Sequence, residues 1–414
     1  MENNNNIISA VEIGTSKVVT LIAQIDHNKT LRLIGHGHST SKGIVKGEMI
    51  GFDQVSNTLH ASMLAAEKSA QVPIDPNNIY LSVSGNHLEG FVNHAQIQVS
   101  GADNIVRDDD CLRLIEEAKR KELPPNRVYV NRVGSPIYLD GKPTANPVGL
   151  VGKSLSVKYW LITGEEKKLR SIARALNAYG FRGKDIFCTA LVVGDLLSSE
   201  EEKKDGCLVI DIGAGTTDFV LYQKGVVAYT GSLPLGGDHL TNDLAIGLRT
   251  HFKQAEELKG RIGKAIEDRS DRNETVMLNE NFSIGNGLIR RHAVNQILHA
   301  RISEIFQTIL QTIGDKWDPN QLRGGIILTG GTAKLDKIEK ATQEFFGVSV
   351  RPGILPNWID QNLRIPEYAT VMGVLNYVFK DQTSKEKTYS KSSNSNLLKR
   401  FINFADRIFN LHNG

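Results

Sequence analysis

Residues 207–230 combine an acidic side chain, a glycine-rich turn and two hydroxyls in an order suited to binding phosphate. An apolar run, Leu208 to Ile210, ends at Asp211, and the turn that follows leads into a second apolar strand. Glycines in such a turn let backbone N–H groups approach an anion closely, and threonine hydroxyls add donors. Asp211 could hold hydrated Mg²⁺, which takes one or two carboxylates together with water and phosphate oxygens. The candidate phosphate-binding residues of this turn are Gly213, Ala214, Gly215, Thr216 and Thr217.

A second turn of the same kind lies near the N-terminus, in residues 9–25. Glu12 takes the place of Asp211, and Lys17 adds a point charge suited to phosphate. One glycine-rich hairpin is a weak signal, but two of them in two halves of a chain predict related lobes that clamp a phosphate tail. The candidate phosphate-binding residues here are Gly14, Thr15, Ser16 and Lys17, and the candidate metal ligands are Glu12 and Asp211.

A third glycine turn, in residues 324–341, joins an apolar strand to a helix predicted from about Leu335. A glycine pair there lets a flat ligand lie against the backbone and points a helix N-terminus at negative charge. Upstream, Glu256 and Lys259 are three residues apart and share one helical face. Taken singly, the turn also fits an ordinary αβ connection, and the pair fits a solvated helix face. The candidate adenosine-binding residues are Glu256, Lys259, Gly330, Gly331, Thr332 and Ala333.

Length and composition indicate an ordinary globular chain of two or three domains, with 414 residues, 40% of them hydrophobic, and a net charge of +3. This charge is too small to indicate nucleic acid as a partner. The cysteines Cys111, Cys188 and Cys207 form no CxxC or Cys/His cluster, which argues against a zinc site or a disulfide framework. No apolar run reaches about 18 residues, so we expect neither a signal peptide nor a membrane span, and a cytoplasmic location.

The chain ends with a polar stretch, residues 381–396, followed by an apolar stripe. Apolar residues at i, i+3, i+4 and i+7 predict an amphipathic helix over residues 397–412. Such a helix is too short to span a bilayer but can lie among anionic headgroups. Docking onto the chain's own body or a partner is the alternative, and the polar stretch favours the membrane. The candidate membrane-binding residues are Leu397, Leu398, Lys399, Arg400, Phe401, Phe404, Ala405, Arg407, Ile408, Phe409 and Leu411.

Together the three turns resemble the phosphate 1, phosphate 2 and adenosine motifs of the actin, Hsp70 and sugar-kinase superfamily. Within it the chain most resembles the FtsA family of bacterial cell-division proteins, over about residues 7–411 and including residues 35–53, 78–91 and 146–164. The resemblance implies an α/β, actin-like two-lobed ATPase fold with duplicated ribonuclease-H-like cores. It also implies a small inserted α+β domain, a C-terminal amphipathic helix, and ATP with Mg²⁺ as ligands.

The resemblance further implies a protein that polymerises and recruits later division proteins. Its terminal helix would tether the tubulin-like ring protein FtsZ to the cytoplasmic face of the cell membrane at midcell. On a long helix predicted over residues 286–314, Arg301 and Glu304 match positions that in the family help hold the FtsZ C-terminal tail. By themselves they also fit a plain surface ion pair. The expected partners are FtsZ, other copies of this chain, an anionic membrane and later division proteins, and not nucleic acid.

Two departures from the superfamily bear on hydrolysis. Glu12 stands where most members have Asp, although its longer side chain could still reach a metal-bound water. In related filament proteins a helix start carries an acidic residue before a proline, and the acid orients the attacking water. Here the matching pair is predicted to be Phe187-Cys188. Losing a general base typically costs about 10²–10⁴ in rate, so we expect ATP binding with weak or no ATPase activity.

Two other functions fit the same motifs. An actin-like ATPase of another membrane-associated assembly, such as pilus biogenesis, shares the small inserted domain, but the amphipathic tail speaks against it. A sugar-kinase-type phosphotransferase would need a catalytic Asp over its substrate, for which the sequence offers no convincing candidate.

The sequence also predicts how the chain divides into segments. The first lobe comprises residues 7–84 and 165–205, together with a closing helix, 361–380, and the inserted interaction domain is 85–164. The second lobe comprises a core, 206–236 and 301–360, and a helical subdomain, 237–300. A flexible linker, 381–396, and the membrane-targeting helix, 397–412, follow.

Overall fold

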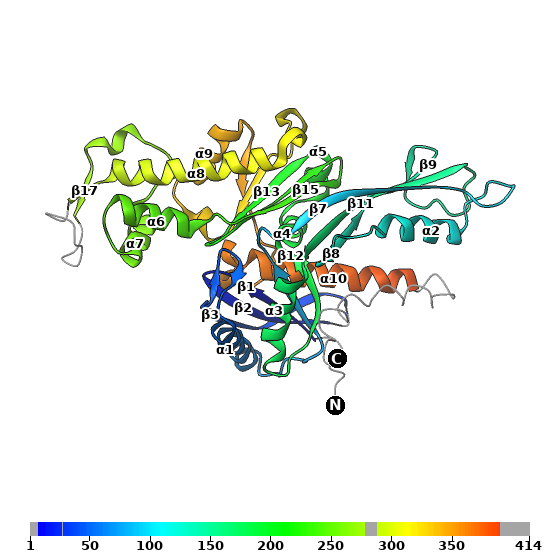
Figure 1. Ribbon diagram of the computed structural model, residues 1–414, viewed down its shortest axis with the longest axis horizontal. Coiled ribbons are helices and arrows are strands. Elements are labelled where there is room, and N and C mark those ends of the chain that lie inside the picture. Colours follow the sequence, from blue (N-terminus) through cyan, green and yellow to red (C-terminus); the bar gives the residue numbers. More distant parts are fainter. Residues whose placement is uncertain (1–6, 27, 278–287, 390–414) are drawn as a thin grey trace.

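Two five-stranded sheets of the same topology form the centres of two lobes in the computed structural model, which describes residues 7–26, 28–277 and 288–389 (Figure 1). In each sheet, three consecutive strands form an antiparallel meander. Two further strands extend the sheet beyond the first strand of the meander, and each pairs parallel with its neighbour. The first lobe contains β1 (Ile7–Ile13), β2 (Lys17–Ile25), β3 (Leu31–Thr40), β6 (Ile79–Val83) and β12 (Gly183–Cys188). The second contains β13 (Cys207–Ile212), β14 (Thr217–Gln223), β15 (Val226–Leu233), β18 (Ile326–Thr329) and β19 (Val350–Pro352).

Helices cover the first sheet and carry its apolar stripes inward. Helix α1 (Phe52–Ala70) buries Val55, Leu59, Met63 and Ala66 against the strands, as its 3.6-residue spacing predicts. It approaches so closely that Gly37 of β3 lies directly under the backbone of Ser62. The other helices of this lobe are α3 (Glu166–Asn177), α4 (Thr189–Leu197) and α10 (Ala369–Tyr389), and a short hairpin, β4 (Ile44–Val45) and β5 (Glu48–Met49), follows β3.

Of the helices in the second lobe, α6 and α7 lie beyond the sheet at the end opposite the inserted domain, whereas α8 and α9 also contact its strands (Figure 1). Helix α8, predicted over residues 286–314, begins at Arg291 because a short strand precedes it. The helices are α6 (Gly237–Gly247), α7 (Phe252–Ile262), α8 (Arg291–Ile313) and α9 (Ile338–Phe346), and the strands are β16 (Thr275–Met277) and β17 (Leu288–Arg290). Short 3₁₀ helices span Arg269–Asn273, Gly314–Lys316, Pro319–Gln321, Gly331–Lys334, Gln361–Leu363 and Pro366–Tyr368.

The inserted domain projects from the first lobe between β6 and α3 (Figure 1). Its long strand β11 pairs with β7 on one side and with β8 and β9 on the other, and α2 packs on the sheet. A small core of its own, which includes Leu114, Leu155 and Val157, makes it a separate unit. Its elements are β7 (Glu89–Gln98), α2 (Asp108–Lys119), β8 (Arg127–Gly134), β9 (Ile137–Leu139), β10 (Lys142–Thr144) and β11 (Ser154–Glu165).

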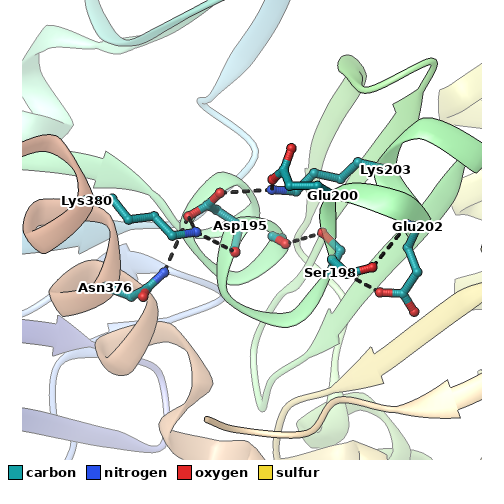
Figure 2. Close-up of polar contacts among 9 residues, drawn as sticks. Asp195, Ser198, Glu200, Glu202, Lys203, Asn376 and Lys380 are labelled. Atoms are coloured by element: carbon teal, nitrogen blue, oxygen red, sulfur yellow. Dashed lines mark hydrogen bonds and ion pairs between the residues drawn. The ribbon is translucent and has the colours of Figure 1, made fainter. Parts of the chain in front are cut away.

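The crossover between the lobes, α4 followed by α5 (Glu200–Asp205), is fastened to α10 by an ion-pair cluster (Figure 2). Asp195 on α4 accepts hydrogen bonds from Lys203 Nζ at 3.0 Å and from Lys380 Nζ at 2.8 Å. Burial alone would raise the pKa of Asp195, but the two lysines hold it below its ordinary value. Arg351 on β19 adds a bidentate bond to Glu202 at 2.8 and 2.9 Å. The joint between the lobes is therefore a fixed, charged contact.

Helix α10 is longer than the sequence predicted. It runs to Tyr389 and so includes residues 381–389, which were expected to belong to the flexible linker. The predicted amphipathic helix, 397–412, lies outside the described residues. None of the helices in the described ranges combines the length and the apolar character needed to cross a bilayer.

Candidate functional site

The turns that end β1 and β13 face each other across a pocket of about 190 Å³. They have the same hydrogen bond: Gly14 N–H donates to Lys17 O at 2.9 Å, and Gly213 N–H donates to Thr216 O at 2.9 Å. A side chain on Gly215 would collide with Thr15, so the two turns touch. The predicted phosphate-binding residues that line the pocket are Gly14, Thr15, Ser16, Lys17, Gly213, Ala214, Gly215 and Thr216. Thr217 does not line it; its hydroxyl donates to Leu235 O at 2.8 Å.

Three carboxylates gather at the floor of this pocket. Asp211 Oδ2 accepts a hydrogen bond from Thr370 Oγ1 at 3.1 Å, and Glu12 Oε1 lies 3.5 Å from Lys17 Nζ. Within the part of the chain that the structure describes, Glu12 Oε2 and Asp218 Oδ1 are buried without a hydrogen-bond partner. Buried carboxylate oxygens without donors are unfavourable, so this cluster is suited to a cation and its water shell.

Burial and mutual repulsion weaken these acids. Burial, followed by repulsion from Asp218 and Glu12, raises the pKa of Asp211 to about 7. Burial raises the pKa of Asp218 to about 6 and also raises that of Glu12. No group of three or more His, Cys, Asp or Glu side chains among the described residues is arranged to hold a metal by itself. The donor set therefore fits Mg²⁺ held by one or two carboxylates together with water and phosphate, and not a closed protein cage.

We expect the ligand-free protein, in EDTA, to lose stability as the pH rises from about 4 to 7. Asp211 is a stronger acid in the unfolded chain, near its model value of 3.8, than in the fold, where its pKa is about 7. The folded state therefore binds more protons across this window, and its stability falls with increasing pH until Asp211 is fully ionised. Urea unfolding at pH 5, 6, 7 and 8 measures this slope. His87, whose pKa is lowered to about 4, contributes the opposite slope, so Asp211→Asn is measured alongside. A wild-type curve that falls no more steeply from pH 5 to 7 than that of Asp211→Asn would contradict the clustered arrangement.

The third glycine turn packs directly on the second phosphate turn. Gly330 has a φ of +89°, which favours glycine, and a Cβ there would collide with Asp211 Oδ1. Thr332 Oγ1 donates to Gly213 O at 3.1 Å. Gly331, Thr332 and Ala333 lie in a 3₁₀ turn, and α9 begins only at Ile338, three residues after the predicted start. The turn thus lies beside the phosphate site without a helix N-terminus directed at it.

Glu256 and Lys259 on α7 reach the same region. Lys259 Nζ donates to Gly237 O at 3.1 Å and forms an ion pair with Glu256 at 2.7 Å. Gly237 in turn lies against Thr332, since a Cβ on it would collide with the Thr332 hydroxyl. Glu256 is half-exposed, with its carboxylate also bonded to Thr241. The predicted adenosine-binding residues are therefore grouped beside the second phosphate turn.

The start of α4 brings a hydroxyl to the pocket. Phe187 packs against Tyr80 and Tyr377 in the first-lobe core. Cys188 is buried, and burial together with repulsion from Asp218 raises its pKa to about 12. Thr189, the first residue of α4, lines the pocket instead. The first residue of α4 thus offers the pocket a hydroxyl and not a carboxylate, and the acids that line the pocket are Glu12, Glu48, Asp211 and Asp218.

Arg301 and Glu304 lie on α8, away from the pocket. Arg301 forms a bidentate ion pair with Asp243 of α6, at 2.6 and 3.0 Å, and a further pair with Glu304. The pair with Asp243 was not predicted, because 58 residues separate the partners. Arg301 remains partly exposed, at 22% of its side-chain area, so it can still meet a partner.

Other residues of the pocket had no predicted role. They include Ser84, His87 and Lys168, which come from the base of the inserted domain and from α3. Lys168 bridges Glu48 at 2.7 Å and Glu165 at 3.2 Å. Burial, and then the positive charge of Lys168, lowers the pKa of His87 to about 4, so this imidazole is neutral at pH 7. No sequence motif marks these residues, because the fold alone brings them to the phosphate turns.

Known families and structures match the chain along most of its length. The model described as "Cell division protein FtsA" matches residues 208–373, and the "SHS2 domain inserted in FTSA" matches residues 85–163. Cell division protein FtsA of Neisseria meningitidis serogroup B is 28% identical over 382 residues, which cover 91% of each chain. The Borreliella burgdorferi protein of that name is 29% identical over 92% of each chain, and that of Bacillus subtilis is 27% identical over 91% of this chain and 84% of its own.

Solved structures show the fold. A PilM–PilN type IV pilus biogenesis complex matches with a TM-score of 0.59 and 16% identity, over 89% of this chain and 98% of the other. MreB 5 of Spiroplasma citri bound to AMPPNP matches with a TM-score of 0.55 and 14% identity, over 94% and 100%. The predicted actin-like fold is confirmed. With matches to both its inserted domain and its second lobe, and relatives along nine-tenths of its length, the chain belongs to the FtsA family of cell-division proteins.

Proposed function

We propose that this protein binds ATP with Mg²⁺ between its two lobes and uses the nucleotide to control its own assembly. The observation that carries the proposal is the pair of matching turns, which face each other over a pocket whose buried carboxylate oxygens lack partners. Glu12 and Asp211 would hold the ion, which would neutralise phosphate charge. The MreB 5 structure with a bound nucleotide analogue has the same fold.

Different groups of the chain would bind the phosphates and the adenosine. Backbone N–H groups of the two turns and the hydroxyls of Thr15, Ser16 and Thr216 would bind the phosphates, and Lys17 would add charge. The turn at Gly330 and the pair Glu256–Lys259 would hold the adenosine. Thr189 at the start of α4 cannot act as a general base for water. Hydrolysis should therefore be weak or absent, and the nucleotide would act chiefly as an assembly ligand.

We further propose that the assembled protein tethers FtsZ to the cytoplasmic face of the cell membrane at midcell. Residues 397–412 would form the membrane helix, with apolar Leu, Ile and Phe toward the lipid and Lys399, Arg400 and Arg407 toward anionic headgroups. One such helix binds weakly, so polymerisation would supply attachment through many copies. Arg301 and Glu304 would hold the FtsZ tail, and the inserted domain would contact later division proteins. A pilus-type role shares only the fold, whereas family membership favours division.

Sedimentation with anionic vesicles tests this function. The full chain should pellet with vesicles, and more so with ATP–Mg²⁺, whereas a chain ending at Asn396 should stay in solution. Equal pelleting of both chains, or of neither, would refute membrane attachment through the terminal segment.

A second arm adds FtsZ to the same vesicles. The full chain should carry FtsZ into the pellet, and Arg301→Ala should still pellet while it leaves at least about nine-tenths of the FtsZ in solution. Arg291→Ala, on the same helix but paired with Glu274, is the matched control. If Arg301→Ala recruits FtsZ as well as the control does, the tail binds elsewhere.

A further inference from the structure

Hydrogen bonds connect the start of the inserted domain to the second lobe. Ser84, the last residue before the domain, donates from Oγ to Asp218 Oδ2 at 2.6 Å, and the same oxygen lies 3.0 Å from Thr216 Oγ1. Its Oγ also lies 3.2 Å from Ser232 Oγ on β15, and Gly85 N–H donates to that same oxygen at 2.9 Å. A single hydroxyl of the first lobe thus contacts the second phosphate turn and the neighbouring strand.

The contact continues along β15 to a buried tryptophan. Trp160 of β11, only 3% exposed, donates from Nε1 to Thr230 Oγ1 at 3.0 Å. A Cβ on Gly90 would collide with both the Trp160 ring and Thr230, so glycine is what lets the indole reach β15. Lys316, also of the second lobe, places Nζ 4.6 Å from the Trp160 ring centroid, within cation–π range. We call Ser84, Trp160, Thr230, Ser232 and Lys316 the cross-lobe strip.

Strand β15 connects this strip to the phosphate turn. It pairs with β14 so that Ser232 faces Asp218 and Thr230 faces Val220. Ser232 and Thr230 are two residues apart and so point to the same side of the sheet, toward the inserted domain. Because β14 begins at Thr217, directly after the turn, a shift of the turn would displace β14 and, through the pairing of the two strands, the hydroxyls on β15. The domain is also held to the first lobe, where Asn131 Oδ1 accepts from Cys188 N–H at 2.8 Å.

We propose that the inserted domain senses the occupancy of the phosphate site through the cross-lobe strip. Ser84 would act as a positioning residue that holds Asp218 and Thr216, and β15 would carry their displacement to Trp160. The orientation of the domain, and hence of any partner or neighbouring subunit bound to it, would then depend on the nucleotide. This rests on the proposed nucleotide binding for its trigger, but the mechanical link itself does not require a ligand.

Hydrogen exchange with mass spectrometry tests the link, with ATP affinity measured separately by calorimetry. In the wild type, ATP–Mg²⁺ should slow exchange in the turn at residues 213–218 and also in residues 85–98 and 154–164. Thr230→Val keeps the shape but removes the acceptor of Trp160. It should leave ATP affinity within about twofold and abolish the protection of the inserted domain. Ser84→Ala should weaken ATP binding about 10-fold.

A ligand-free arm separates the two proposals. Without nucleotide, Thr230→Val should speed exchange at residues 213–218 at least about threefold, whereas Ser135→Ala, in the same domain but outside the strip, should not. Full protection of the inserted domain in Thr230→Val, or an unchanged ligand-free turn, would overturn the inference. If ATP fails to bind the wild type, the proposed function is wrong and this arm alone decides the mechanical link.

Discussion

Asp211→Asn should abolish tight, Mg²⁺-dependent ATP binding and at the same time make the ligand-free protein harder to unfold at pH 8. The carboxylate of Asp211 is buried beside Asp218 and Glu12, and their repulsion contributes to raising its pKa to about 7. At pH 8 this carboxylate is ionised at a cost to the fold, and an amide removes that cost. The same change removes a ligand of the proposed Mg²⁺. ATP binding therefore favours Asp at position 211, whereas the stability of the ligand-free fold favours Asn.

The expected magnitudes are at least about 100-fold in ATP–Mg²⁺ affinity and about 1–3 kcal/mol in the free energy of unfolding in EDTA. Calorimetry and urea unfolding measure the two quantities. Asp110→Asn is the comparison, because Asp110 is also inaccessible to solvent but accepts hydrogen bonds from Ser100 Oγ at 2.6 Å and Arg107 N–H at 2.9 Å. That variant should lose stability. Destabilisation by Asp211→Asn as well would show that the pocket carboxylates are satisfied without a ligand.

Gly37→Ala should destabilise the first lobe by about 3 kcal/mol or more, although it adds a single methyl group. A Cβ at Gly37 would lie 2.0 Å from Ser62 O in α1, and the backbone of Ala66 is almost as close. Neither is the end of a flexible side chain, so α1 would have to move away from the sheet. That movement would also break the bond from Ser62 Oγ to Gly37 O, now 3.1 Å, and overpacking of this kind is costly.

Gly260→Ala should change the stability in the opposite direction in the same experiment. Gly260 lies inside α7 with open space where a Cβ would stand, so alanine should stabilise the helix by about 0.5–1 kcal/mol. Thermal unfolding of both variants against the wild type measures the difference. A Tm for Gly37→Ala within a degree or two of the wild type would mean that α1 is held loosely, contrary to the close packing described above.

The sequence allowed the phosphate turns to be predicted because each is a local feature: a strand, a few small residues and another strand. In the second turn, the prediction assigned one residue too many, Thr217, to phosphate binding. Thr216 and Thr217 are adjacent where β14 begins, so their side chains point to opposite sides and only Thr216 faces the pocket. At the start of α4, Phe187 and Cys188 are buried in the first-lobe core, and it is the next residue, Thr189, that lines the pocket.

The polar contacts that complete the site could not be predicted from local patterns. Thr370 lies 159 residues from Asp211, and Ser84 lies 134 residues from Asp218. Single hydroxyls carry no periodicity or motif, and only the meeting of distant strands and helices gives them a partner. The end of α10 was misplaced for another reason. Residues 381–389 have no apolar stripe, and their polar composition suggested a linker, yet the structure continues the helix through them.

This longer α10 sets geometric limits on the proposed membrane tether. The helix has 21 residues and is therefore about 31 Å long, and it starts beside the phosphate site, where Thr370 bonds to Asp211. It runs toward the side of the molecule from which the inserted domain projects (Figure 1). Residues 390–396 are all that separate Tyr389 from the apolar stripe, and a chain of that length can reach at most about 25 Å. In the proposed tether the end of α10 would thus be held within about 25 Å of the lipid-bound stripe, so the end of this helix would lie on the membrane side of the molecule.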